Sequence, residues 1–290
     1  MVKRNLEMTV NRILYDYSPL YSKLTQGSII NGCVAEAFPN KEVFGVIITP
    51  RCDLSHDGKV LTVHYVPLVP FELWFDVIAK PIIKELWKKD LANKLDSKFN
   101  NAKVGSGIME ADFTYDDLRK IVEQKVLKQK DKEEIKILLE AYFDINELAL
   151  KKYLLDENSH KRGHKMFDFF SRLQENSIHS YYLLEGWKEY GENKHLVVML
   201  RDVRRIEYNI ANRIGKGVEE SNLSLEDTTH SDLFLTAEKN NFYFIQALIA
   251  SPFIEHIMEA FVYNFSRIGV EDRPGNTFEL LNESVKTAIK

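Results

Sequence analysis

The residues best suited to chemistry lie in one short polar segment that separates two apolar runs. The segment contains Arg51, Cys52, Asp53, Ser55, His56, Asp57 and Lys59. Cys52, His56 and the nearby His64 offer a thiolate and two imidazoles, which zinc accepts, and Cys33 could complete a tetrahedral set. The spacing matches no zinc finger, ribbon or knuckle. The alternative is structural, with both cysteines as small buried hydrophobic residues and His56 as a solvated turn residue.

The same segment allows two further roles. Arg51 and His56 could favour the thiolate form of Cys52 and make it a nucleophile, although no glycine-rich oxyanion elbow is visible. Alternatively, Asp53 accepts hydrogen bonds from backbone amides and locks the turn. We therefore predict that Arg51, Cys52, Asp53 and His56 form a functional or structural focus. We also predict that Cys52 is not disulfide-bonded to Cys33.

A second candidate is the pair Arg172 and His179, at the end of a predicted helix. An arginine followed by a histidine at such spacing resembles the active-site motif of HEPN ribonucleases. Arginine can hold a phosphate in a bidentate grip, and histidine titrates near neutral pH. The polar residue often placed beside the arginine is absent, because Leu173 stands there. A nuclease toxin, either HEPN-like or metal-assisted, is therefore our alternative function.

Composition restricts the class of protein. The chain has 290 residues, of which 44% are hydrophobic and 28% charged, and its formal net charge is -4 at pH 7. This is the profile of a globular protein, and its negative charge argues against nucleic acid as the main partner. Two cysteines and no recognisable signal peptide favour the cytoplasm, and no apolar run reaches the roughly 18 to 20 residues of a membrane span. We find no phosphate-binding loop, HExxH or GxSxG motif, so we expect no cofactor.

Apolar patterning predicts five short strands in one sheet, near residues 28–36, 43–49, 60–66, 179–184 and 195–201. The run from Val43 to Ile48 is apolar enough to be buried on both faces, which the first three strands alone cannot achieve. Between the third and fourth strands lies a long interruption with helical spacing. The sequence therefore predicts an α+β fold, a small split SH3-like or OB-like β-barrel with a helical insertion and a helical C-terminal region.

The predicted organisation follows from these boundaries. Its parts are an N-terminal arm or helix at 1–26, the first part of the barrel at 27–70, the helical insertion at 71–176, the remaining strands at 177–206 and the helical C-terminal region at 207–290. Within the insertion, Pro81 marks a kink or a new start, and Thr114 is an N-cap. Helices are expected at about 132–142 and 145–155, and another at 237–250.

The last predicted helix runs from Pro252 to Ile268, with Ser251 as its N-cap and Gly269 as its stop. One face is apolar and should be buried. The other face carries the stripe His256, Glu259, Tyr263 and Arg267, at three- and four-residue spacing. Because tyrosine and arginine are enriched at interfaces, we expect this stripe to face a partner or a second copy of the chain. An intramolecular polar stripe is the alternative.

Two segments are the most distinctive in the chain: Thr49-Pro-Arg-Cys-Asp-Leu54, and Ser251-Pro-Phe-Ile-Glu-His256 continuing to Phe265-Ser-Arg-Ile-Gly-Val270. Together they resemble an uncharacterised group of bacterial proteins associated with anti-phage or mobile-element conflict loci. That group brings no established catalytic residues. The resemblance implies a bacterial cytoplasmic protein that acts beside other proteins of a defence operon. We therefore predict a non-catalytic interaction or sensing component, whose partner is a protein encoded in the same operon or a second copy of the chain.

Overall fold

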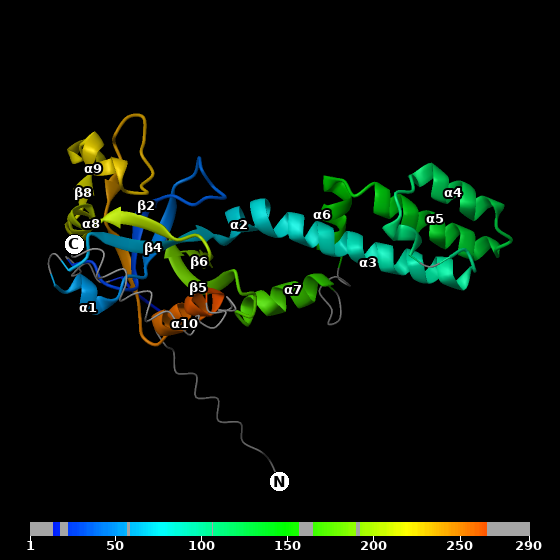
Figure 1. Cartoon of the computed structure of the whole chain (residues 1–290), viewed down its shortest axis with the longest axis horizontal. Coiled ribbons are helices and arrows are strands. Elements are labelled where there is room, and N and C mark those ends of the chain that lie inside the picture. Colours follow the sequence, from blue (N-terminus) through cyan, green and yellow to red (C-terminus); the bar gives the residue numbers. More distant parts are fainter. Residues whose placement is uncertain are drawn as a thin grey trace, which may run out of the picture.

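A computed structural model of the chain describes residues 14–17, 23–56, 59–105, 107–156, 165–189 and 192–265. The fold is α+β, with a nearly closed antiparallel β-barrel at one end and a long helical arm that projects from it (Figure 1). This confirms the predicted class, a barrel combined with helical regions.

The main sheet has eight strands within the described residues. They are β1 (Tyr15–Asp16), β2 (Ser28–Cys33), β3 (Val43–Ile47), β4 (Thr62–Pro70), β5 (Tyr181–Glu189), β6 (Glu192–Met199), β7 (Arg204–Glu207) and β10 (Ile245–Ile249). The order is β1-β10-β2-β3-β4-β6-β5, with β7 paired to the first part of β4. All five strands that the sequence predicts lie in this sheet, so that prediction is confirmed. A separate two-stranded sheet contains β8 (Val218–Glu219) and β9 (Phe242–Tyr243).

Aromatic side chains join the two ends of the main sheet. The rings of Tyr15 and Trp187 meet edge to face with centroids 5.3 Å apart, and Tyr17 lies 5.5 Å from Trp187. The backbone amide of Lys188 also donates to the Tyr17 hydroxyl at 2.8 Å. Among the described residues, these contacts stand in place of a backbone ladder between β1 and β5. They cover strand edges that would otherwise be open to pairing with another chain.

The strands separate two hydrophobic cores. Every strand in the order from β1 to β5 contributes to the core inside the barrel, which Ile254 and Ile257 of α10 (Phe253–Phe265) close. The opposite face of the sheet packs against α2 (Phe71–Trp74), α7 (Lys165–Gln174) and α8 (Tyr208–Lys216). Val46 faces the inner core and Ile47 the outer one. The segment Val43–Ile48 is therefore buried on both faces of the sheet, as predicted.

The arm begins as one unbroken helical run, formed by α2, the π-helical turn η1 (Phe75–Ala79) and α3 (Lys80–Asn101). Pro81 explains the π turn, because proline has no amide proton to donate to the carbonyl four residues earlier. The amide of Lys80 instead donates to the carbonyl of Phe75, five residues back. The irregularity expected at Pro81 is thus a π turn just before the proline, inside a continuous helix.

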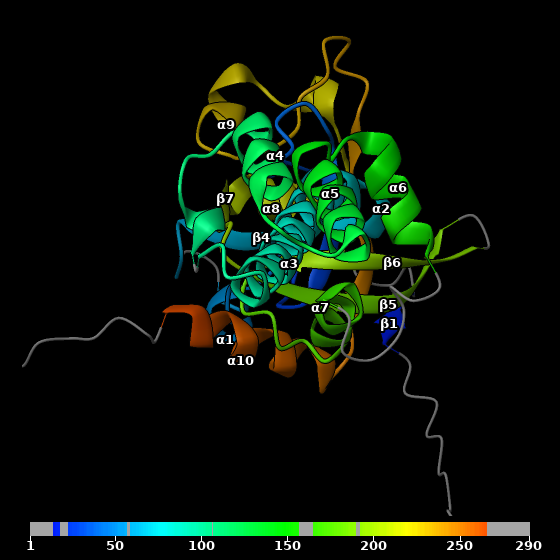
Figure 2. The ribbon, with the colours of Figure 1, turned by 90° about the vertical axis from the view of Figure 1, so that its right-hand side faces the viewer.

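The tip of the arm folds around a small core of its own. The 3₁₀ turn η2 (Ile108–Glu110), α4 (Tyr115–Gln124) and α5 (Gln129–Phe143) pack on the far half of α3. Leu95 and Phe99 of α3 meet Leu118, Val122, Ile135 and Leu139 there. Figure 2, which looks along the arm, shows α3, α4 and α5 grouped in front of the barrel. The chain returns through α6 (Glu147–Leu155), whose Tyr153 ring stacks on Trp87 of α3 at 4.4 Å.

The predicted N-cap of α4 is confirmed. The Thr114 hydroxyl accepts a hydrogen bond from the Asp117 amide at 3.3 Å, and the Asp117 carboxylate accepts one from the Thr114 amide at 3.1 Å. These two bonds form a capping box, which satisfies amides that the first turn of a helix leaves without partners.

The C-terminal region differs from the prediction because it is not purely helical. The prediction of a helix at 237–250 is wrong. The strands β9 and β10 occupy that stretch, and β10 lies between β1 and β2 in the main sheet. Ala247 and Ile249, two residues apart, are buried in the barrel, which is the period of a strand. The 3₁₀ turn η4 (Glu220–Asn222) and α9 (Leu225–Thr229) precede them. In the N-terminal segment, Tyr15 and Asp16 form a strand rather than a helix.

Candidate functional site

The polar segment after β3 folds into the four-residue helix α1 (Arg51–Leu54), which follows Pro50. Two contacts hold the polar segment together: the Asp53 carboxylate lies 2.5 Å from Lys59 Nζ, and His56 Nδ1 lies 2.9 Å from the Cys52 carbonyl oxygen. The hydrogen bond from Lys59 holds the pKa of Asp53 below its usual value. Among the described residues, Asp53 therefore stabilises this turn through Lys59, and not through the backbone amides suggested by the sequence.

The geometry does not support a metal site in this segment. Cys33 is buried in the outer core and Cys52 is exposed, and both are free thiols, in agreement with the prediction. His64 is exposed on β4, opposite Arg205 of β7. Within the described part of the chain, no three His, Cys, Asp or Glu side chains lie close enough together to hold a metal ion. Cys52, His56 and His64 therefore do not form the metal site considered above.

The ribonuclease-like pair is divided between two environments. Arg172 is exposed in the last turn of α7, and its carbonyl accepts hydrogen bonds from the Ser177 amide at 2.8 Å and the Ser177 hydroxyl at 3.1 Å. His179 lies in the turn before β5, where its ring packs on Tyr263 of α10 with centroids 4.9 Å apart. His179 lines a groove whose described lining does not include Arg172.

That groove, which we call the α10 groove, lies where α10 meets the turn between α7 and β5 and the end of β6. Its volume is about 320 Å³. The residues that matter below are Ser177, His179, Tyr182, His256, Glu259 and Tyr263. The groove unites residues that the sequence suggested for two different roles: the histidine of the ribonuclease-like pair and the stripe on the last helix.

The docking of α10 explains why the stripe borders this groove. Ile254 and Ile257 are buried in the barrel, which fixes the rotation of the helix about its axis. His256, Glu259 and Tyr263 then line up along another side, beside the α7–β5 turn, and remain exposed. The stripe thus has an intramolecular neighbour and an open side. Arg267, Gly269 and the end of the predicted helix lie outside the described residues, and α10 begins at Phe253 rather than Pro252.

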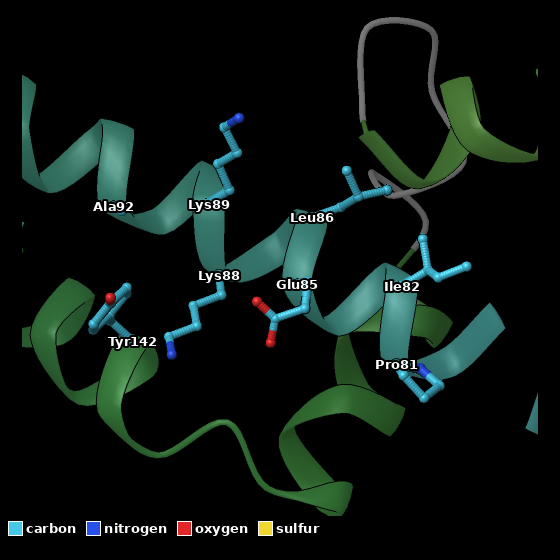
Figure 3. Close-up of a pocket in the computed structure, with 8 residues that line it drawn as sticks. All are labelled: Pro81, Ile82, Glu85, Leu86, Lys88, Lys89, Ala92 and Tyr142. Carbon is cyan, nitrogen blue, oxygen red and sulfur yellow. The ribbon is translucent and has the colours of Figure 1, made fainter. Parts of the chain in front are cut away.

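A second groove, which the sequence analysis does not predict, lies on the arm, and we call it the arm groove. It has a volume of about 650 Å³ and is lined by Pro81, Ile82, Glu85, Leu86, Lys88, Lys89, Ala92 and Tyr142 (Figure 3). Its aliphatic lining comes from α3. Lys88 reaches across to α5, where its ammonium lies 5.4 Å from the centre of the Tyr142 ring. Because the groove depends on how α5 packs along α3, no single segment of the sequence signals it.

Comparison with known proteins does not place the chain in a family. A scan of protein-family models found no match, and neither did searches of curated proteins and of solved structures. None of the helices in the described ranges combines the length and the apolar character needed to cross a membrane. Function is therefore inferred from the grooves, contacts and charges of this chain alone.

Proposed function

We propose that the protein is a non-catalytic interaction component of a bacterial cytoplasmic assembly, in the setting of anti-phage defence, and that it docks a protein partner through its helical arm. One observation carries this proposal. The arm stands away from the barrel, has its own hydrophobic core and bears an open groove with an aliphatic lining (Figures 1 and 3). A groove between helices that is partly apolar is a common docking place for an amphipathic helix.

The exposed side chains of the arm support a binding role. Ile137 of α5 and Leu148 of α6 are each 62% exposed, and Leu155 at the end of α6 is 70% exposed. Single apolar residues on a surface are ordinary, but several on one projecting element offer area that a partner can cover. The arm is therefore a better candidate for partner binding than the barrel, whose strands are packed on both faces.

The charges beside the arm groove indicate what kind of helix fits. Lys88 and Lys89 flank the aliphatic lining, together with one carboxylate, Glu85. Complementary potentials guide association and select partners. The partner segment that best matches is an amphipathic helix with acidic residues beside its apolar face. A protein encoded in the same operon is the proposed source of this helix, and a second copy of the chain is the alternative.

The test uses two substitutions on α3 that introduce the same residue. Ala92→Glu places a carboxylate in the arm groove without removing a core side chain, whereas Asn93→Glu places one on the neighbouring exposed position. Each variant is co-expressed with the proteins of the neighbouring genes, and the mass of the assembly is measured by light scattering. We expect the wild type and Asn93→Glu to form a complex that Ala92→Glu weakens at least tenfold. No complex with the wild type, or equal complexes with both variants, would refute the proposal.

The nuclease alternative has less support. Arg172 does not line the groove that His179 lines, and the metal-assisted version lacks a ligand cluster among the described residues. Incubation of the purified protein with RNA and DNA, with and without divalent cations, tests it directly. Cleavage that disappears in His179→Ala would establish the alternative over the interaction role.

A further inference from the structure

The α10 groove has an unusual balance of charge for a site that carries two histidines. Among the described residues that line it, Glu259 is the one with a full formal charge at neutral pH, and none is lysine or arginine. No ion pair joins Glu259 to another residue within the described ranges. An exposed carboxylate at the edge of an aromatic hollow favours a cation over a phosphate or another anion.

Aromatic rings supply the second half of a cation site. Tyr263 is 44% exposed, and its contacts include the tilted packing of its ring on His179. Tyr182, which is buried, forms another part of the lining. A cation within about 6 Å of a ring centre is attracted by the ring's negative face, and guanidinium groups use this contact most often.

The spacing of residues on α10 places the carboxylate and the aromatic ring next to each other. Glu259 precedes Tyr263 by four residues and follows His256 by three, so its carboxylate lies between a phenol ring and an imidazole on one side of the helix. This order suits a planar group that stacks on a ring while its edge hydrogen-bonds to a carboxylate. Guanidinium has that shape, and an ammonium group does not.

One described arginine contacts α10 from outside the groove lining. Arg201, just after the end of β6, donates from Nε to the Asn264 side-chain oxygen at 3.3 Å. It therefore lies against the last turn of α10, and it is not part of the groove lining. The volume of about 320 Å³ is at the small end of ligand pockets, which suits a single side chain.

From these observations we infer that the α10 groove binds an arginine side chain of the protein partner, with its guanidinium paired to Glu259 and stacked on Tyr263. The inference deepens the proposed function and rests on it only for the source of the arginine. It assigns the partner a second contact, some distance from the arm groove: an exposed arginine that enters the hollow beside α10.

The test needs no partner, because N-acetyl-arginine amide serves as the probe. Its binding is followed in the NMR signals of the His179, His256 and Tyr263 rings, and N-acetyl-citrulline amide, which has nearly the same shape but no charge, is the control ligand. Glu259→Gln removes the charge from the groove. Glu255→Gln, at an exposed position on the same helix and outside the lining, is the matched control variant.

We expect saturable shifts with the arginine probe and none with citrulline. A hydrogen bond to a charged group is worth enough that Glu259→Gln should weaken binding by about tenfold, while Glu255→Gln leaves it unchanged. The inference is wrong if citrulline binds as well as arginine, if Glu259→Gln has no effect, or if inorganic phosphate gives the saturable shifts instead. It is equally wrong if no ring signal moves at probe concentrations up to about 50 mM, where even weak millimolar binding would show.

The two experiments separate the two ideas. If the arm variants have no effect on assembly but the arginine probe binds through Glu259, the arm proposal fails and the groove chemistry stands. If the arm variants act as expected and the probe does not bind, the arginine site alone is refuted. The melting temperature of each variant, measured in parallel, shows whether the fold is intact.

Discussion

Gly32 in β2 offers the sharpest test of how the barrel is packed, through the substitution Gly32→Ala. Its φ angle is 70°, in the left-handed region, and the side chain of Tyr243 lies directly over it. A Cβ atom added at this position would lie 2.0 Å from Cδ1 and 2.2 Å from Cε1 of that ring. Tyr243 is fully buried and its hydroxyl donates to the Phe234 carbonyl at 2.9 Å, so the ring has little freedom to move away.

The expected loss of stability in Gly32→Ala has two parts. Forcing an alanine into the left-handed region costs about 1–2 kcal/mol. Displacing a buried ring to make room for the new methyl group adds about 1–3 kcal/mol. Gly32→Ala should therefore lower the free energy of unfolding by about 2–5 kcal/mol.

Gly186 provides the control that separates these parts. Its φ angle is 74°, close to that of Gly32, but a Cβ atom there would have no atom within 4 Å. Gly186→Ala should cost only the conformational part, about 1–2 kcal/mol. Urea unfolding followed by circular dichroism measures both variants. If Gly32→Ala is no more destabilising than Gly186→Ala, the close packing of Tyr243 on Gly32 does not exist as described.

Four further predictions concern the cysteines and the arm. A thiol reagent should label Cys52 rapidly in the native protein and Cys33 only after denaturation, because burial raises the pKa of the Cys33 thiol; equal native labelling would contradict this. Thr114→Ala should destabilise the arm by about 1 kcal/mol, measured by hydrogen exchange in α4. Hydrogen bonds from Thr114 lower the pKa of Asp117 in the folded state. The Asp117 carboxylate therefore stabilises the arm fully at pH values above its ordinary pKa of 3.8, and this stabilisation is lost as the pH falls through the lowered pKa. Asp117→Asn should therefore reduce the dependence of arm stability on pH in that acid range, and an unchanged acid profile would refute the bond. Leu139→Ala should cost about 2–5 kcal/mol and speed exchange at the tip while the strands stay protected, because the tip has a separate core.

The fold was largely predictable where local sequence determines structure. Val43 to Ile48 is dense in β-branched residues and bounded by a proline, and Thr114 with Asp117 forms a cap from neighbouring residues. The strand β10 was not predictable in this way. Its short, mostly apolar sequence, which contains Gln246, is compatible with a helix or a strand. The choice is made by pairing with β1 and β2, which lie far away in the sequence.

The candidate site likewise combines features that local sequence predicts with features that depend on distant contacts. The residue types are recognisable in the sequence, because His179 follows Arg172 closely and the α10 stripe has a helical period. Their meeting in one groove depends on how Ile254 and Ile257 anchor the helix in the barrel, which no periodicity specifies. The arm groove depends on how α5 packs along α3, which is a property of packing and not of any one segment.

The position of β10 also has a consequence for how the protein is made. The core at the tip of the arm is built from residues between Leu95 and Tyr142, so the tip can form soon after that stretch leaves the ribosome. The barrel has to wait for residues 245–249, because without them β1 has no neighbour and β2 has an open edge. A nascent chain that stalls before this point would carry a folded arm tip and an unfinished sheet, whose free edge can pair with another chain. Translation through the codons for β10 is therefore the step that separates a chain prone to aggregation from a finished one.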